Sequence, residues 1–103
     1  MLLSGYRLAA EQGEVNSQFM LGAMYYSAAL HHEIKKIQNV QEKGVIQENF
    51  LSHMWFNIAA TNGDEEAAEW RDKSAGKMTS ADIVKALVMA RECMDSDYKN
   101  CGW

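Results

Sequence analysis

The stretch MWFNIAATNGDEEAA, residues 54–68, contains the end of one predicted helix, a tight turn and the start of the next helix. Asn62 and Gly63 tolerate the left-handed backbone that closes a helix, and the acidic residues 64–66 suit the positive end of the helix that follows. A second junction of the same kind, AAEQGE, lies at residues 9–14, fifty positions earlier. Two helix–glycine–helix junctions in a short chain indicate a repeat protein.

The composition predicts a single all-α domain over residues 1–103. The chain is 48% hydrophobic and 23% charged, which is typical of a globular protein with one modest core. It contains no proline, and strand-like alternation of apolar and polar residues is not sustained anywhere. The net charge of −4 comes without a basic face, and no apolar run approaches membrane-spanning length. We therefore expect neither a nucleic-acid partner nor membrane insertion.

The spacing of apolar residues predicts five amphipathic helices. Gly22 is costly inside a helix, so we expect it to mark the close approach of a neighbouring helix. Thr79 and Asp82 resemble a capping box that opens the last helix. The predicted helices cover about residues 2–12, 14–26, 47–62, 64–78 and 80–94, with Lys43-Gly44 as a stop before the third. The predicted buried sides are Phe50, Leu51, Met54, Trp55, Ile58 and Ala59 in the third helix, and Ile83, Leu87, Ala90 and Met94 in the fifth.

Several of these segments together resemble the Sel-1-like repeat family, bacterial relatives of the tetratricopeptide repeats. The resemblance covers nearly the whole chain. It implies an α-solenoid of about two helix-turn-helix repeats, the first of which lacks its leading helix. The segments that carry it are AAEQG (9–13), LGAMYY (21–26), GV (44–45), MWFNIAA (54–60) and GDEEA (63–67), with residues 71–72, 77–79 and 90–92 similar to the final helix pair of bacterial members.

Residues 27–43 depart from the family pattern. The family has a short glycine-containing loop after the tyrosine pair, whereas here 17 residues separate Tyr26 from Gly44. The excess of about fourteen residues is close to four helical turns, so we expect an extended or inserted helical segment after the second helix. A straight extension would reach about 20 Å beyond the repeat, with an apolar seam that nothing in the same repeat covers. A loop with a short helix folded back onto the repeat is the alternative.

The resemblance implies a protein–protein interaction or scaffold module with no catalytic activity and no cofactor. One of the two adjacent tyrosines should pack inward while the other lines an exposed groove. The apolar seam and the uncovered face of the first helix also predict a homodimer, through residues 27–43 or through the N-terminal helix. The alternative functions are a periplasmic immunity protein that neutralises a toxin, and an enzyme such as a hydrolase. The candidate partner-contacting residues are Tyr25, Tyr26, Leu30, Ile34 and Ile37.

The motifs of catalysis and metal binding are missing from the sequence. The HHE run at residues 31–33 places three adjacent side chains in different directions on a helix, so they cannot converge on one ion. Glu65, Glu66 and Glu69 occupy the first turns of a helix, where the helix dipole favours negative charge. Ser-His-Asp, Cys-His and phosphate-loop signatures are absent. The sequence therefore predicts no enzyme, no catalytic residue and no bound metal.

Cys93 and Cys101 are the only cysteines. Turn-forming residues in the irregular tail, residues 95–103, favour a chain reversal that would bring Cys101 beside Cys93. Two free thiols in a reducing cytosol are the alternative. Family members with a similar Tyr-Lys-x-Cys tail favour the disulfide, and with it a periplasmic or secreted protein rather than a cytoplasmic one. The first residues are too short and polar for a signal peptide, so if the protein is exported, its signal has been removed or lies upstream.

Overall fold

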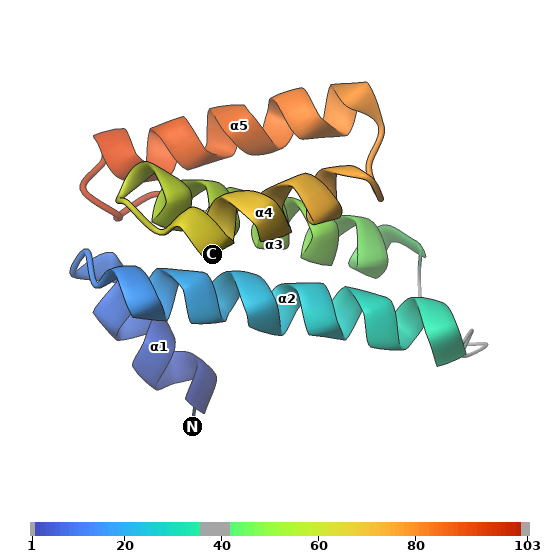
Figure 1. Ribbon diagram of the computed structural model, residues 1–103, viewed down its shortest axis with the longest axis horizontal. Helices are drawn as coiled ribbons and strands as arrows, with labels where there is room; N and C mark the ends of the chain where they lie inside the picture. The colour runs from blue at the N-terminus through green and yellow to red at the C-terminus, as the bar shows by residue number, and fades with distance from the viewer. Residues whose placement is uncertain (1, 36–41, 102–103) are drawn as a thin grey trace.

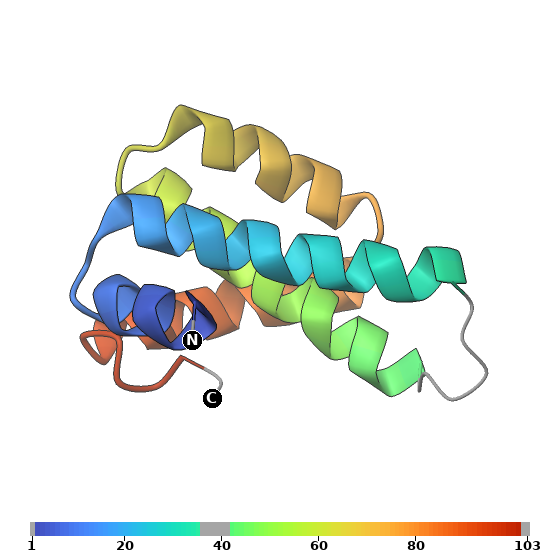
Figure 2. The same cartoon turned by 90° about the horizontal axis from the view of Figure 1, so that it is seen from below.

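The computed structural model describes residues 2–35 and 42–101, with side chains at residues 5–33 and 44–101. These residues form five helices and no strand, which confirms the all-α prediction. Helix α3 lies at the centre and packs against α2, α4 and α5, while α1 packs against α2 (Figure 1). Figure 2 shows α1 and α4 on opposite sides of α2. The helices are α1 (Leu2–Glu11), α2 (Val15–Lys35), α3 (Glu42–Thr61), α4 (Glu65–Ala75) and α5 (Ser80–Asp95).

The two helix–glycine–helix junctions have the same hydrogen-bond pattern. Each closes with a Schellman motif, in which a glycine at positive φ and the acidic residue after it donate backbone N–H groups back to the last helical turn. The φ angle is 85° at Gly13 and 107° at Gly63. The acidic residue then caps the next helix through its carboxylate. The backbone pairs are Glu14–Ala9 and Gly13–Ala10 at the first junction, and Asp64–Ala59 and Gly63–Ala60 at the second, at N···O distances of 3.0–3.1 Å.

Helix α3 is buried on nearly every side. Residues 49–56 are all buried, including the polar side chains of Asn49, Ser52 and His53. The predicted buried side is confirmed at all six positions, and Trp55 is 0% exposed. The prediction that this helix is amphipathic is wrong, because α2, α4 and α5 cover it from different directions.

Trp55 belongs to one of two apolar clusters built around α3. Its cluster joins α3 to all the other helices except α4 and also includes the C-terminal tail. The second cluster joins α3 to α2 and α4 and is centred on Phe56. The buried members of the first cluster are Ala10, Leu21, Leu51, Met54, Trp55, Ile58, Ala90, Cys93 and Cys101.

The inserted segment lengthens two paired helices. Helix α2 continues to Lys35, and α3 begins at Glu42 rather than near Gln47, so the predicted stop at Lys43-Gly44 is wrong. Helix α3 lies alongside the extension of α2, and Leu30, the one seam residue whose side chain is described, is 39% exposed. The two helices are joined there by a 2.9 Å hydrogen bond between His32 Nδ1 and Glu48 Oε1. Ile37 and the side chain of Ile34 lie outside the described residues.

Helices α2 and α3 are in close contact at Gly22. A Cβ atom at Gly22 would lie 2.6 Å from Cδ1 of Phe56, whose ring is fully buried. The Gly22 carbonyl also accepts a 3.1 Å hydrogen bond from the Ser52 hydroxyl. These contacts confirm the expected close approach of a neighbouring helix at this glycine.

The substitution Gly22→Ala should therefore lower the free energy of unfolding by about 1–3 kcal/mol, as overpacked cores do. Alanine has the better helix propensity, by about 1 kcal/mol, but the added methyl group has no space. Gly44→Ala is the matched control, since a Cβ atom at Gly44 in α3 would meet nothing within 4 Å. Urea denaturation followed by circular dichroism measures both variants. A Gly22→Ala protein as stable as the wild type would show that Phe56 does not need this space.

Helix α5 begins at the predicted cap, where the Thr79 hydroxyl accepts a 3.1 Å hydrogen bond from the Asp82 N–H. Within α5, Ala90 is buried, and Ile83 and Met94 are half-buried. The prediction is wrong for Leu87, which is 40% exposed. Leu87 instead lies on the outer surface of the protein, because the inward positions of α5 are taken by smaller residues.

The C-terminal tail folds back onto the body of the protein. A disulfide joins Cys93 to Cys101, which confirms the expected pairing, and both residues are buried. The chain reverses at Asp97 and Tyr98, whose φ angles of 57° and 64° are uncommon for residues other than glycine. Tyr98 packs against the Trp55 cluster.

The tail also meets both glycine junctions. The Asn62 side-chain amide donates to Gln18 Oε1 over 2.8 Å and to the Tyr98 hydroxyl over 3.2 Å. The amide of Gln18, which is fully buried, donates in turn to the Ala10 carbonyl over 3.2 Å. These bonds connect three helix ends that are far apart in the sequence.

Candidate functional site

A cleft of about 470 Å³ opens between α2 and α4, with α3 forming its floor. Its lining is mostly apolar and rich in aromatic rings. The apolar residues of α2 that line it, Phe19, Ala23, Tyr26 and Leu30, recur at spacings of four, three and four and so share one face of the helix. The lining residues are Phe19, Ala23, Tyr26, Ser27 and Leu30 from α2, Phe56 from α3, and Glu66 and Trp70 from α4.

The aromatic rings of the cleft hold one another in place. Phe56 forms the floor and is fully buried, whereas Tyr26 and Trp70 are only half-buried. The centroids of Tyr26 and Trp70 are 5.3 Å apart in an edge-to-face arrangement. The Phe56 centroid lies 5.6 Å from that of Phe19 and 6.3 Å from that of Trp70. Contacts of this kind fix ring orientations, so the cleft is preformed.

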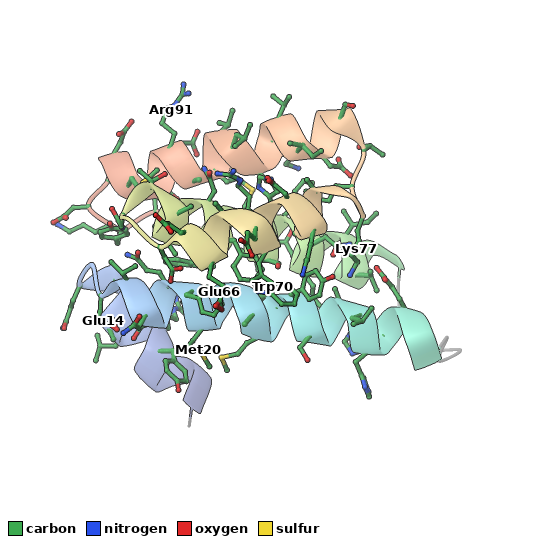
Figure 3. All side chains as sticks on the ribbon, viewed as in Figure 1. Glu14, Met20, Glu66, Trp70, Lys77 and Arg91 are labelled. Atoms are coloured by element: carbon green, nitrogen blue, oxygen red, sulfur yellow. A yellow bond between two sulfur atoms is a disulfide. The ribbon has the colours of Figure 1, made fainter. Side chains whose placement is uncertain are left out.

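Glu66 is the charged residue among those that line the cleft. Glu66 and Trp70 lie along the side of α4 that faces α2, and Lys77 follows the end of this helix (Figure 3). The Lys73 ammonium lies 4.1 Å from the centroid of the Trp70 ring. The Lys77 ammonium lies 4.7 Å from the Tyr26 centroid and forms a 3.4 Å ion pair with Glu33. The arrangement can therefore orient a ligand that is apolar over most of its length and positively charged at the end near Glu66.

The cleft brings together only some of the residues that the sequence singled out. Tyr26 and Leu30 line it, and Leu30 is 39% exposed. Tyr25 packs against the Trp55 cluster, where burial raises the pKa of its hydroxyl above the usual range. The two adjacent tyrosines thus divide between core and cleft, as expected from their adjacency. That Tyr25, Tyr26 and Leu30 contact a partner stays a prediction.

Sequence reasoning missed the contribution of Phe19, Phe56 and Trp70 to the cleft, because aromatic residues at helical spacing are equally typical of a core. The spacing of Phe19, Ala23, Tyr26 and Leu30 was the available signal. An apolar stripe of this kind predicts a buried helix face equally well. In the structure the stripe stays accessible because α2 and α4 lie apart over α3.

A row of polar side chains lies on another side of α3, next to α4. Asn57 accepts a 3.2 Å hydrogen bond from Arg71 Nη1. One helical turn away, His53 is buried, and its Nδ1 atom has no hydrogen-bond partner among the described residues. Burial, assisted by the positive charge of Arg71, lowers the pKa of His53 below its usual range. This histidine is therefore enclosed in the interior of the protein, where burial favours the uncharged form of its ring.

Among the described residues, no group of three or more His, Cys, Asp or Glu side chains is placed to hold a metal ion. None of the helices over residues 2–35 and 42–101 combines the length and apolar character needed to cross a bilayer. Comparisons of the chain with protein-family models, with curated proteins and with solved structures found no match.

Proposed function

We propose that the chain is a protein–protein interaction module of the Sel-1-like repeat type, which holds an apolar segment of a partner protein in the cleft between α2 and α4. The single observation that supports this function best is the solvent-open aromatic lining of the cleft. In this proposal the module has no catalytic activity of its own and needs no cofactor.

The chemistry of the cleft suits a protein ligand. Half-buried Tyr26 and Trp70 offer large apolar surfaces that lose little conformational entropy on binding, which is why Tyr and Trp are enriched where proteins bind each other. The Glu66 carboxylate would orient a bound segment without carrying most of the affinity. Together these features favour a segment of apolar side chains next to a positively charged residue.

The repeat assignment is supported by the two junctions. The same Schellman motif and the same acidic cap occur fifty residues apart, at residues 9–17 and 59–67. Together with the resemblance of the surrounding segments, this favours two diverged copies of one helix-turn-helix unit in an α-solenoid. In that scheme α1 is the second helix of an incomplete first repeat, α2 and α3 form the next repeat, and α4 and α5 are the final helix pair.

The disulfide favours a second candidate function, which also consists of binding a protein. A buried cystine is compatible with an oxidising compartment such as the periplasm. A periplasmic immunity protein would use the same cleft, with an effector toxin as its partner. The two candidates differ in the identity of the partner and not in the binding surface.

The substitution Leu30→Glu tests the proposed function. A carboxylate in the apolar cleft would have to be desolvated on binding, so the affinity for a partner should fall at least tenfold. The tagged wild-type chain is used to capture partners from its native source, and the captured protein, identified by mass spectrometry, is then purified and titrated against each variant. Stability should stay unchanged, because Leu30 is already 39% exposed.

Leu8→Glu is the matched control. Leu8 is 60% exposed on α1 and does not line the cleft. The Leu8→Glu variant should bind the captured partner as tightly as the wild type does. Equal loss of affinity in both variants, or in neither, would contradict binding in the cleft.

A further inference from the structure

Helix α5 presents an exposed apolar face on the side of the protein away from the cleft. Val84, Leu87 and Val88 are 59%, 40% and 46% exposed. Their spacing of i, i+3 and i+4 places them on one face of the helix. Arg91 continues this face at i+7 and points away from the body of the protein (Figure 3). Three neighbouring apolar side chains followed by a cation form the pattern of a helix that docks into a groove.

The cleft between α2 and α4 is long enough to hold this face of α5. Along α2 its lining extends from Phe19 to Leu30, which is about 16 Å of helix. The face of α5 from Val84 to Arg91 spans about 10 Å, so it fits within the cleft. Figure 1 shows α5 and α2 on opposite sides of α4, so the exposed face of α5 cannot reach the cleft of its own chain.

The charges of the cleft and of the α5 face are complementary in one orientation of the docked helix. If Val84, Leu87 and Val88 enter the aromatic part of the cleft, Arg91 reaches the Glu66 end when the docked helix runs antiparallel to α4. The reverse orientation would place Arg91 away from Glu66 and toward the exposed Lys73, where like charges repel. An antiparallel arrangement of the docked helix and α4 also opposes their helix dipoles.

We propose that a second copy of this chain occupies the cleft, with its α5 face of Val84, Leu87 and Val88 against the aromatic rings and its Arg91 paired with Glu66. This inference rests on the proposed function, since it names the partner of the same cleft. The contact is heterologous: each copy offers a cleft to one neighbour and α5 to another, so association continues beyond a dimer unless the ring closes.

Sedimentation velocity over a range from micromolar to hundreds of micromolar tests the proposal with the full chain. The wild type should show a sedimentation coefficient that rises with concentration. The double variant Leu87→Glu, Val88→Glu keeps an intact cleft but loses the α5 face, and Leu30→Glu keeps the α5 face but loses the cleft. Each variant alone should therefore stay monomeric. Mixed together, the two variants should form a one-to-one complex and nothing larger, because one functional cleft and one functional α5 remain.

A charge exchange tests the orientation. Glu66→Arg should weaken self-association about fivefold or more, and adding Arg91→Glu should restore it. Glu65→Arg is the matched control, because Glu65 is an exposed acid in the same first turn of α4 but does not line the cleft. Failure of the second substitution to restore association would overturn the assigned pairing.

Two further results would overturn the proposal as a whole. Self-association of Leu30→Glu that is as strong as that of the wild type would show that α5 packs on α5 instead of entering the cleft. A wild type that stays monomeric throughout, with partner capture still lost in Leu30→Glu, would refute the second copy as occupant and leave the proposed function standing. If capture also survives Leu30→Glu, both proposals fail.

Discussion

Replacing Trp55 with alanine is expected to lower the free energy of unfolding by about 3–5 kcal/mol, the range for large-to-small substitutions in a core. The Trp55 side chain is 0% exposed and lies in the cluster that joins α3 to α1, α2, α5 and the tail. A cavity in that position would remove contacts from four segments at once. Since small domains have only about 5–15 kcal/mol of stability, the variant should be close to unfolding at room temperature.

Trp70→Ala is the natural comparison. Trp70 is only half-buried on α4 and borders the cleft, so its loss should cost clearly less stability. Guanidinium denaturation of the two variants, followed by far-UV circular dichroism, measures the difference. A loss below about 1 kcal/mol for Trp55→Ala would mean that this ring is not part of the core.

Loss of the Cys93–Cys101 disulfide is expected to destabilise the protein by about 2–3 kcal/mol, the chain-entropy value for so short a loop. The bridge also holds the reversal at Asp97 and Tyr98, where two successive side chains adopt positive φ. Without it, Tyr98 should leave the Trp55 cluster more readily, and the tail should be the first segment to open.

Denaturation with and without a thiol reductant measures this effect, and the double variant Cys93→Ala, Cys101→Ala should reproduce it. Alanine is preferred to serine because both positions are buried. Thiol titration of the unfolded, unreduced protein gives the direct check. Two reactive thiols per chain in protein from an oxidising compartment would refute the bridge.

The parts of the fold that sequence reasoning predicted are those governed by local chemistry. Gly13 and Gly63 end their helices because they accept positive φ, and Thr79 begins one because its hydroxyl caps it. The buried side of α3 was predicted correctly because large apolar side chains are most stable when they are removed from water. Each of these inferences depends on a few neighbouring residues.

The errors arise where distant segments decide the outcome. Gly44 reads as a helix stop in isolation, yet α3 runs through it because α2 supplies a packing partner for the extension. Leu87 fits an inward stripe, but small residues such as Ala86 and Ala90 occupy the packed side of α5. The cleft could not be predicted either, since it depends on how far apart α2 and α4 lie over Phe56.

The central position of α3 has a consequence for how such a protein can evolve. A linear array gains or loses units at its ends, because each unit contacts only its neighbours. Here α1 and the C-terminal segment both enter one cluster on α3, with Ala10 from α1 and Cys93 and Cys101 from the C-terminal segment. Deleting either segment would expose the rings and sulfur atoms left behind. Helix α3 therefore constrains the evolution of two segments that are far apart in the sequence, since neither can be lost without uncovering it.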